Sequence, residues 1–243
     1  WVAAWPRSAV SPASDADAAD RDFGFGDQRI FASAAAVQQP NALFGAQRLY
    51  PLVKLTVIGT GYVGLVTGTC FAEVGHQVVC VDSDNDKVQL LRRGGMPIYE
   101  PGLEELVKSN VTAGRLGFTH STREGVEKSD VIFIAVPTPP LPDGSVDLSF
   151  MEGVARDIAS LMTSYKIVVD KSTVPVRTGD KVGETIRRYC KHQVEFDVVS
   201  NPEFLREGHA VEDLMKPDRI VIGVRSERPV QAMKEIYAPF KAP

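Results

Sequence analysis

Two carboxylates, Glu203 and Glu207, stand four residues apart in the stretch SNPEFLREGHAVEDL at positions 200–214. Asn is favoured at a helix N-cap and Pro at the first helical position, so Asn201 and Pro202 predict that a helix begins here. On that helix the two acids lie about 40° apart around the axis and share one face. A shared face can present both acids to one ligand for proton transfer, or both can simply favour the helix macrodipole by roughly 0.3–1 kcal/mol each. The stretch by itself leaves these two interpretations open.

A second pattern with chemical potential is the glycine turn GTGYVG, which follows the apolar run KLTVI. Gly59, Gly61 and Gly64 fit the G-x-G-x-x-G fingerprint of dinucleotide-binding proteins. The first glycine makes a tight turn, the second lets the backbone approach a pyrophosphate, and the third allows close packing of the helix that follows. The whole turn that we expect around the pyrophosphate is Gly59, Thr60, Gly61, Tyr62, Val63 and Gly64.

The acid that this fingerprint requires stands at the end of the next predicted strand, QVVCVD. Asp82 follows Gly61 by 21 residues, where a carboxylate accepts hydrogen bonds from the adenosine ribose. Because Asp82 would repel a 2′-phosphate and no Arg follows it directly, the sequence predicts NAD rather than NADP as the cofactor. The nearest cation after Asp82 is Lys87. FAD uses a similar fingerprint, but no other feature of the sequence favours it.

These residues need a sheet to position them, and the apolar runs of the sequence predict one. The stretch between the first two strands repeats apolar residues with the period of one helical face and ends at Gly75, which predicts a helix. Further strands are predicted at 130–136, 166–170, 196–200 and 219–223, with helices at 150–163 and 178–190. The alternation predicts an α/β protein with a Rossmann-like, doubly wound, mostly parallel sheet and helices on both faces. Ligands of such sheets bind beyond the carboxyl ends of the strands.

The composition is that of an ordinary globular protein, and it argues against several classes of partner. Lys and Arg number 27 against 31 Asp and Glu, a net charge of -4, so no basic footprint exists for nucleic acid or an anionic membrane. No run approaches the ~18 apolar residues of a membrane span. Three cysteines are too few, and odd in number, for a disulfide scaffold, which favours a reducing, cytoplasmic location. The four histidines show no ligand spacing, so no metal site is expected.

The first 52 residues differ in composition from the rest of the chain. They contain both tryptophans and neither Lys nor Glu, whereas Lys and Glu recur steadily after position 54. They also lack the basic region followed by an apolar stretch that a secretory signal requires. We therefore expect two parts: residues 1–52 as a disordered or non-native extension, and residues 53–243 as the nucleotide-binding domain.

Six short motifs occur in an order that resembles one known family. They are TVIGTGYVG, PIYEPGL, VPTP, KSTVPVRTG, SNPEFLREG and KPDRIVIG, spread over about 54–240. Together they resemble the N-terminal, NAD-binding domain of the UDP-glucose/GDP-mannose dehydrogenase family. The resemblance implies a four-electron oxidation, in which a primary alcohol of a nucleotide sugar becomes a carboxylate while two NAD⁺ are reduced in succession. It also implies an active-site cysteine that holds the intermediate as a thiohemiacetal and then as a thioester.

The resemblance further implies roles for individual residues. Cofactor contacts are implied for the glycine turn and for Asp82, Lys87, Val136, Thr138, Ser172 and Thr173. Contacts with the nucleotide sugar are implied for Glu203, Phe204, Leu205, Arg206 and Glu207. Within these sets, Thr173 positions a water and Glu203 performs the acid and base work of thioester hydrolysis. Glu207 is implied to touch both cofactor and substrate, which would answer why two acids stand so close together.

By the same resemblance, the nucleophilic cysteine and the Lys and Asn that stabilise the oxyanion belong to a segment beyond residue 243. Cys70 and Cys80 lie at predicted core positions and are interpreted as packing residues. Cys190 is far from that segment in the family pattern. The full-length protein that the resemblance implies adds a central helix and a C-terminal UDP-binding domain, and it forms a homo-oligomer.

Alternatives remain open for the function. Within the family, KPDRIVIG favours UDP-glucose as the substrate, but GDP-mannose and UDP-N-acetylhexosamines are compatible with most of the same motifs. In a different class, the chain would be a non-catalytic NAD-binding module whose fold reports cofactor binding alone.

Overall fold

The computed structural model of the protein describes residues 50–175, 177–240 and 242. All of these belong to one of the two units into which the chain divides, Ala42–Pro243. The expected extension at 1–52 falls almost wholly on residues 1–49, which lie outside the described part of the chain.

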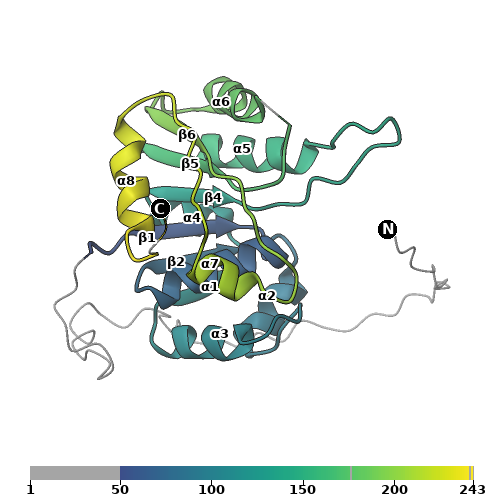
Figure 1. The fold of residues 1–243 in the computed structure, drawn as a ribbon. Coiled ribbons are helices and arrows are strands. Elements are labelled where there is room, and N and C mark those ends of the chain that lie inside the picture. The colour runs from purple at the N-terminus through teal and green to yellow at the C-terminus, as the bar shows by residue number, and fades with distance from the viewer. Residues whose placement is uncertain (1–49, 176, 241, 243) are drawn as a thin grey trace, which may run out of the picture. The chain divides into compact units, whose positions relative to one another are not determined.

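The described residues form a parallel sheet of six strands in the order β3-β2-β1-β4-β5-β6 (Figure 1). The strands are β1 (Lys54–Ile58), β2 (Gln77–Val81), β3 (Leu116–Thr119), β4 (Val131–Ile134), β5 (Lys166–Asp170) and β6 (Phe196–Ser200). Every neighbouring pair is parallel. The chain builds outward from β1 to β3 and then restarts at β4 on the other side of β1, which confirms the predicted doubly wound sheet.

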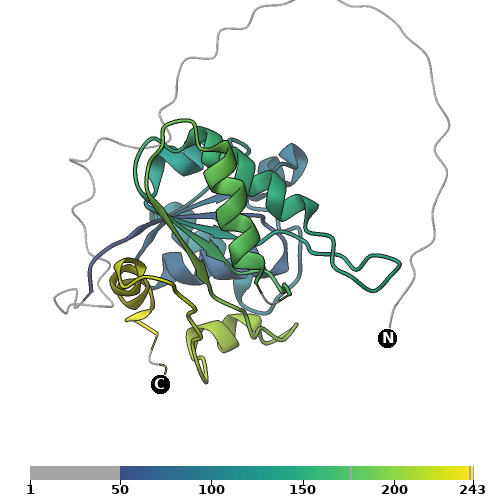
Figure 2. The same ribbon diagram turned by 90° about the horizontal axis from the view of Figure 1, so that it is seen from above.

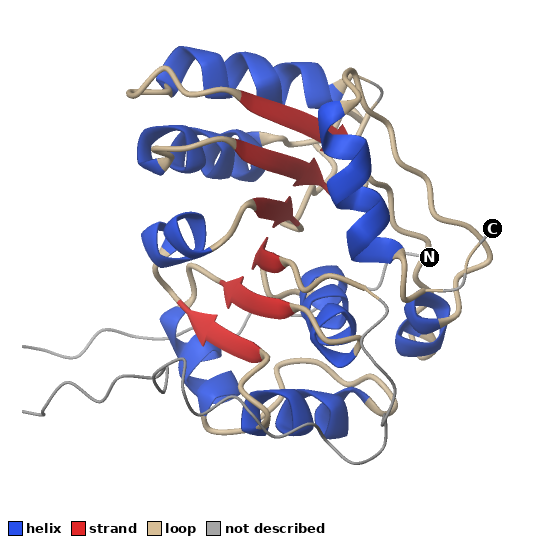
Figure 3. Cartoon of the chain, turned by 90° about the vertical axis from the view of Figure 1, so that its left-hand side faces the viewer, coloured by secondary structure: helices blue, strands red, loops and turns tan. Residues whose placement is uncertain are grey.

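Helices cover both faces of the sheet, as Figure 3 shows. They are α1 (Tyr62–Glu73), α2 (Asn85–Arg92), α3 (Leu103–Thr112), α4 (Thr122–Lys128), α5 (Ser149–Leu161), α6 (Thr178–Tyr189), α7 (Ala210–Met215) and α8 (Arg228–Tyr237). Buried residues of α1, α2, α3, α7 and α8 form one core cluster, and those of α4, α5 and α6 form the other. From above, green α6 and yellow α8 lie on opposite sides of the strands (Figure 2). None of the described helices is long and apolar enough to cross a membrane.

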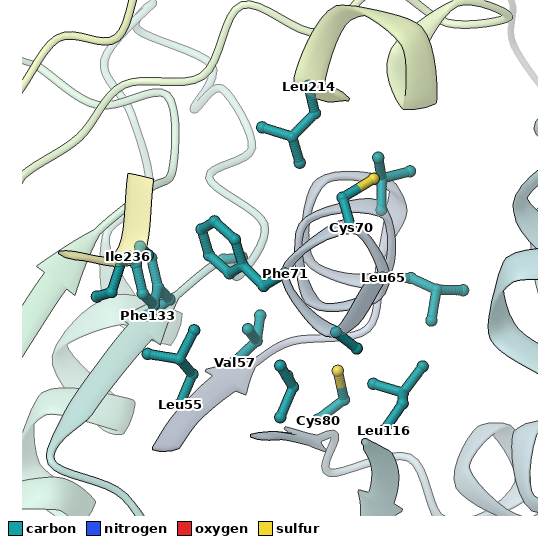
Figure 4. Packing of buried hydrophobic residues seen from close by; sticks show 14 of the residues in the cluster. Leu55, Val57, Leu65, Cys70, Phe71, Cys80, Leu116, Phe133, Leu214 and Ile236 are labelled. Atoms are coloured by element: carbon teal, nitrogen blue, oxygen red, sulfur yellow. The ribbon is translucent and has the colours of Figure 1, made fainter. Parts of the chain in front are cut away.

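An aromatic group anchors the C-terminal helix to the larger core. The ring of Phe71 in α1 lies 5.1 Å from that of Phe133 in β4 and 5.5 Å from that of Tyr237 in α8. All three residues are buried, and Figure 4 shows Phe71 and Phe133 with Cys70 and Cys80 among the packed side chains. The first pair is tilted and the second is edge-to-face. Such aromatic pairs contribute about 0.5–1.5 kcal/mol each beyond their buried area. This group therefore fixes α8 against the sheet.

Several predicted boundaries agree closely with the structure. The strands predicted at 166–170 and 196–200 coincide with β5 and β6, and the helices predicted at 150–163 and 178–190 correspond to α5 and α6. The first helix ends at Glu73, and Gly75 follows with a φ of +109°, as its predicted role in closing the helix requires. The strand β3 was not predicted because it has only four residues and includes a glycine.

The prediction that a helix begins at Asn201 and Pro202 is wrong. Residues 201–206 are non-helical and α7 begins only at Ala210, so Glu203 and Glu207 do not share a helical face. The Asn201 side chain is held by other segments, and its Nδ2 donates to the Val221 carbonyl at 2.9 Å. Its Oδ1, the atom that would cap a helix, accepts instead from Lys171 Nζ, just after β5, and from the Tyr237 hydroxyl at the end of α8. Contacts with distant segments thus override the local capping preference.

The prediction of a strand at 219–223 is also wrong. This segment meets the sheet at a single antiparallel bridge, in which Gly223 and Ser200 exchange hydrogen bonds of 2.7 and 2.9 Å. Ser200 is the last residue of β6. Because the segment pairs with this one residue and in the antiparallel sense, it does not extend the parallel ladder.

Candidate functional site

The glycine turn joins β1 to α1 at the carboxyl edge of the sheet, where the strand order reverses. Gly59 has a φ of +101°, and a Cβ there would overlap the Ala135 carbonyl oxygen beyond β4. A Cβ on Gly64 would overlap the carbonyl oxygen of Gly59. These two glycines are therefore required by the close approach of protein backbone to protein backbone.

Gly61 differs from the other two glycines because a Cβ there would meet nothing within 4 Å. It is the N-cap of α1, and no side chain caps that end of the helix. The first N–H groups of a helix have no partner inside the helix and favour an anion. The open space at Gly61 and the uncapped helix end fit the pyrophosphate of a dinucleotide, with Tyr62 and Val63 supplying the next backbone donors.

Asp82 lies directly after β2 and is bound to the glycine turn. Its Oδ2 accepts hydrogen bonds from Thr60 N at 2.8 Å, Thr60 Oγ1 at 2.6 Å and Lys87 Nζ at 3.1 Å. Its Oδ1 accepts from Asp84 N at 3.0 Å. Burial raises the pKa of Asp82, but the hydrogen bonds from Thr60, Asp84 and Lys87 outweigh burial and hold the pKa below its ordinary value. Asp82 is thus a carboxylate at neutral pH, and Lys87 lies against it.

The loops after β4 and β5 are joined to each other by side chains that the sequence analysis named. Ser172 Oγ donates to the Val136 carbonyl at 2.9 Å, and Thr138 Oγ1 donates to the Thr173 carbonyl at 2.9 Å. Ser172 N also donates to Asp170 Oδ1 at 3.1 Å. The four named residues therefore form one connected wall at the carboxyl edge.

Thr173 and Glu203 meet across the ends of β5 and β6. Thr173 Oγ1 lies 3.5 Å from Glu203 Oε1, at the limit of a hydrogen bond. The other oxygen, Oε2, accepts from Leu205 N at 2.6 Å. The Glu203 carboxylate is thus oriented by its own loop, with one oxygen directed toward the Thr173 hydroxyl.

The residues after Glu203 have different surroundings. Phe204 is 48% exposed, and the Arg219 guanidinium lies 4.9 Å from the centre of its ring. Leu205 packs against the larger core cluster. The Arg206 side chain is paired with Asp213, with Nη2 to Oδ1 at 2.6 Å and Nε to Oδ2 at 3.1 Å. Glu207 is exposed in the turn before α7.

Glu100 is a buried acid at this site that the sequence analysis did not single out. Its Oε2 accepts from Gly208 N at 2.8 Å and from the Tyr62 hydroxyl, and its Oε1 accepts from Ala210 N at 2.7 Å. Burial raises its pKa, but the hydrogen bonds from Tyr62, Gly208, Val211 and Ala210 prevail and lower it. The motif PIYEPGL contains Glu100, yet no local pattern in it indicates burial of the acid.

Lys171 is a second residue that the sequence analysis missed. It is 3% exposed, and its Nζ donates to Asn201 Oδ1 at 3.3 Å. Together with Glu203 it lines a cavity of about 30 Å³, large enough for a water molecule. Burial lowers the pKa of Lys171 to about 8, against the opposing effect of the Glu203 charge. A buried cation thus lies beneath the loop that carries Glu203.

The described cysteines do not form a nucleophile at this edge. Burial raises the pKa values of Cys70 and Cys80 to about 12, so both thiols stay protonated in the core. Cys190 follows α6, which returns from the end of β5 toward the start of β6, so it lies at the opposite edge of the sheet. Within the described ranges, no three His, Cys, Asp or Glu side chains come together as a candidate metal site.

Comparison with known proteins gives the family. The model of the UDP-glucose/GDP-mannose dehydrogenase family, NAD binding domain, matches residues 53–241. The UDP-glucose 6-dehydrogenase of Rhizobium meliloti is 54% identical over 191 residues, which are 77% of this chain and 44% of that protein. The UDP-glucose 6-dehydrogenase TuaD of Bacillus subtilis is 49% identical, over 78% of this chain and 41% of that protein. The chain therefore spans less than half the length of these relatives.

Solved structures agree with the sequence comparison. A UDP-glucose dehydrogenase from Pyrobaculum islandicum superposes with a TM-score of 0.78 at 44% identity, covering 82% of this chain and 46% of that one. A GDP-mannose dehydrogenase from Pseudomonas aeruginosa superposes with a TM-score of 0.74 at 37% identity, covering 78% of this chain and 45% of that one. Because the family model matches most of the chain, the chain belongs to the UDP-glucose/GDP-mannose dehydrogenase family and contains its NAD-binding domain.

Proposed function

We propose that the protein carrying this chain oxidises the C6 alcohol of UDP-glucose to the carboxylate of UDP-glucuronate, with NAD⁺ as the oxidant. The observation that carries the proposal is the meeting of Thr173 and Glu203, 3.5 Å apart, at the sheet edge that also holds the glycine turn. Relatives that are 49–54% identical are named UDP-glucose 6-dehydrogenases, which supports UDP-glucose as the substrate.

The cofactor site is proposed to use the turn from Gly59 to Gly64 for the pyrophosphate. Open space at Gly61 and the uncapped end of α1 support this assignment. Asp82 is proposed to accept hydrogen bonds from the adenosine ribose, and its charge excludes a 2′-phosphate. Lys87 acts by holding Asp82, to which its ammonium donates at 3.1 Å. When bound, NAD⁺ supplies the hydride acceptor.

The wall formed by Val136, Thr138, Ser172 and Thr173 is proposed to line the cofactor cleft. Three hydrogen bonds of 2.9–3.1 Å within the wall and to Asp170 fix these loops before any ligand arrives. Rigid loops that exclude water and orient ligands lower the entropic barrier to reaction.

Glu203 is proposed to accept a proton from the water that hydrolyses the acyl intermediate. Its Oε2 is occupied by Leu205 N, so Oε1, near the Thr173 hydroxyl, is the oxygen that faces the reaction. A water held between Thr173 and Glu203 would lose its proton to Oε1 as it attacks. Lys171, beneath the same loop, places a buried ammonium group near this carboxylate.

The segment from Phe204 to Glu207 is proposed to lie along the nucleotide sugar. The exposed ring of Phe204 offers an apolar surface. Arg206 contributes mainly through its position, because Asp213 already pairs with its guanidinium. Glu207 is proposed to contact both cofactor and substrate. The complete protein is proposed to be a cytoplasmic homo-oligomer, and residues 1–52 an extension outside the catalytic domain.

The test compares this chain with the complete protein that contains it. We expect the 243-residue chain to bind NAD⁺ in a calorimetric titration and to form no NADH with UDP-glucose, because no described cysteine reaches the site. The complete protein should form two NADH for each UDP-glucose consumed. The absorbance of reduced nicotinamide measures this ratio. Faster turnover with GDP-mannose or a UDP-N-acetylhexosamine would reassign the substrate, and absence of any turnover by the complete protein would indicate a binding module.

A further inference from the structure

We propose that Glu100 and Tyr62 are a positioning pair that couples the cofactor turn to the acid-bearing segment 203–211. Binding of NAD at the turn would then fix the backbone that follows Glu207, and with it the placement of Glu207. The inference rests on the proposed function of these acids. It concerns how their segment is held, and it gives Glu100 a role that the motifs alone do not assign.

Glu100 joins three parts of the chain that are far apart in sequence. It lies 38 residues after Tyr62 and 108 residues before Gly208, and it is 5% exposed. Oε2 accepts from the Tyr62 hydroxyl and from Gly208 N at 2.8 Å. Oε1 accepts from Ala210 N at 2.7 Å, with Val211 N at 3.5 Å. Both oxygens therefore carry bonds to the segment that follows Glu207.

These bonds require a carboxylate rather than any polar side chain. An ionised carboxylate accepts at both oxygens, whereas an amide has one acceptor and one donor end. A glutamine at position 100 would turn an N–H group toward the backbone N–H of either Gly208 or Ala210. Buried donors without acceptors destabilise the arrangement that contains them. The Glu100→Gln exchange therefore removes half of the link while preserving side-chain volume.

Tyr62 connects this link to the cofactor turn. It is the first residue of α1, next to Gly61, so its backbone N–H belongs to the proposed phosphate cradle. Its hydroxyl donates to Glu100 and also accepts from Gly208 N at 3.0 Å. Burial, with the hydrogen bond to Glu100, raises the pKa of Tyr62 to about 12, so the hydroxyl remains a donor at neutral pH. A phosphate that fixes the backbone of Tyr62 thereby fixes the partner of Gly208.

The acid-bearing segment is held at both of its ends. At one end, Glu203 is bound to Leu205 N and lies near Thr173. At the other end, Gly208, with a φ of +85°, is bound by Glu100 and Tyr62. Glu207 is the residue immediately before this second attachment. Releasing that attachment frees the backbone that aims Glu207, while Glu203 keeps its local hydrogen bond.

The test is amide hydrogen exchange on the 243-residue chain with and without saturating NAD⁺, together with calorimetric affinities. In the wild type, NAD⁺ should slow exchange in both the turn 58–66 and the segment 203–211. In Glu100→Gln, protection of the turn should persist at saturation while NAD-dependent protection of 203–211 is lost. Because coupling is reciprocal, the affinity for NAD⁺ should also fall by roughly fivefold or more.

Two further variants keep the test decisive. Tyr62→Phe removes one hydroxyl and leaves the hydrogen bonds that Gly208 N and Ala210 N donate to Glu100. It should therefore reduce the NAD-dependent protection of 203–211 without unfolding the chain. Glu104→Gln removes an acid whose side chain is 52% exposed in the neighbouring helix and should behave as the wild type. Equal NAD-dependent protection in wild type, Glu100→Gln and Tyr62→Phe would overturn this inference and leave the proposed function standing. Failure of the wild type to bind NAD⁺ would overturn the proposed function as well.

Discussion

Asp82 has two tasks at the scale of single residues. It is proposed to bind the ribose, and it also holds the glycine turn through Thr60 N at 2.8 Å and Thr60 Oγ1 at 2.6 Å. We expect Asp82→Ala to weaken NAD⁺ binding by roughly 1.5–3 kcal/mol, or about 10- to 100-fold. The affinity for NADP⁺ should fall less, because the charge that repels its 2′-phosphate disappears with the carboxylate. Calorimetric affinities for both cofactors measure the difference.

Thr60→Val separates the two tasks of Asp82. It deletes the hydroxyl donor to Asp82 and keeps the backbone donor and the carboxylate. This control should lower the affinities for NAD⁺ and NADP⁺ slightly and leave the ratio of the two affinities unchanged. If Asp82→Ala also leaves that ratio unchanged, Asp82 acts through the turn and does not face the ribose.

Glu203 is the residue on which the proposed hydrolysis depends. In the complete protein, Glu203→Gln should slow hydrolysis of the acyl intermediate by ~10²–10⁴-fold, since an amide does not accept a proton from water. Hydride transfer should be affected less. Stopped-flow absorbance should therefore show a burst of NADH followed by slow turnover, and Glu212→Gln, on the exposed side of α7, should show neither. A first turnover as slow as the later ones would place Glu203 in the oxidation steps.

At the scale of elements, the strand–turn–helix unit uses its glycines for different reasons. Gly61→Ala places a methyl group in open space and should change the free energy of unfolding by no more than about 0.5 kcal/mol. The same methyl group would block close approach of a pyrophosphate, so NAD⁺ affinity should fall roughly tenfold or more. Thermal unfolding and calorimetry on the same sample check both statements.

Gly64→Ala is the matched control for the turn. Its methyl group would overlap the Gly59 carbonyl oxygen, so the variant should lose about 1–3 kcal/mol of stability as an overpacked site. Normal stability of Gly64→Ala, or normal NAD⁺ affinity of Gly61→Ala, would contradict the division of roles between the two glycines.

His76 connects the start of β1 to α8. Its Nδ1 accepts from Val53 N at 3.3 Å, and its Nε2 donates to the Ile236 carbonyl at 2.9 Å, an arrangement that requires the neutral ring. Burial lowers the pKa of His76, against the opposing effect of the hydrogen bond to Ile236. The unfolded chain has the higher pKa and binds the proton more readily. The contribution of neutral His76 to stability is therefore present above about pH 6.5 and is lost as the pH falls toward the folded pKa.

His76→Gln tests this pH dependence. The free energy of unfolding of the variant should be lower by roughly 1–3 kcal/mol at pH 7.5, because the part-buried Val53 N–H and the buried Ile236 carbonyl become poorly paired. The difference from the wild type should shrink at pH 5.0, because protonation of His76 in the unfolded chain then favours unfolding of the wild type. Urea unfolding at both pH values measures this, and a difference that is constant with pH would show that His76 does not titrate in this range.

At the scale of the whole molecule, the family match begins at residue 53 and every described site residue lies at position 59 or later. Removal of residues 1–49 should therefore leave the affinity for NAD⁺ within about threefold of that of the full chain. The shortened chain retains Val53, whose N–H donates to His76. Calorimetry on both chains measures the effect, and a larger loss of affinity would show that the first 49 residues take part in the domain.

The sequence alone determined the parts of this protein that depend on local backbone geometry. The strand from Lys54 to Ile58, the positive φ of Gly59 and the place of Asp82 directly after β2 agree with the predictions, because strand periodicity and glycine conformation are properties of neighbouring residues. β5 and β6 were identified in the same way. The binding role of Asp82 stays a prediction. The same local reasoning failed at Asn201, where a capping preference of about 1 kcal/mol yields to contacts with Val221 and with buried side chains.

Only the tertiary structure decided which distant residues meet at the carboxyl edge of the sheet. Glu100 and Gly208 are 108 residues apart, and Thr173 and Glu203 are 30 apart. Their spacing in the chain carries no periodic signal, because each pair is brought together by separate strands and loops. Burial of Glu100 and Lys171 likewise depends on what covers them, and a buried charge persists only where donors or an opposing charge surround it. That condition is fixed by the packing of the whole domain and cannot be read from either residue's neighbours in sequence.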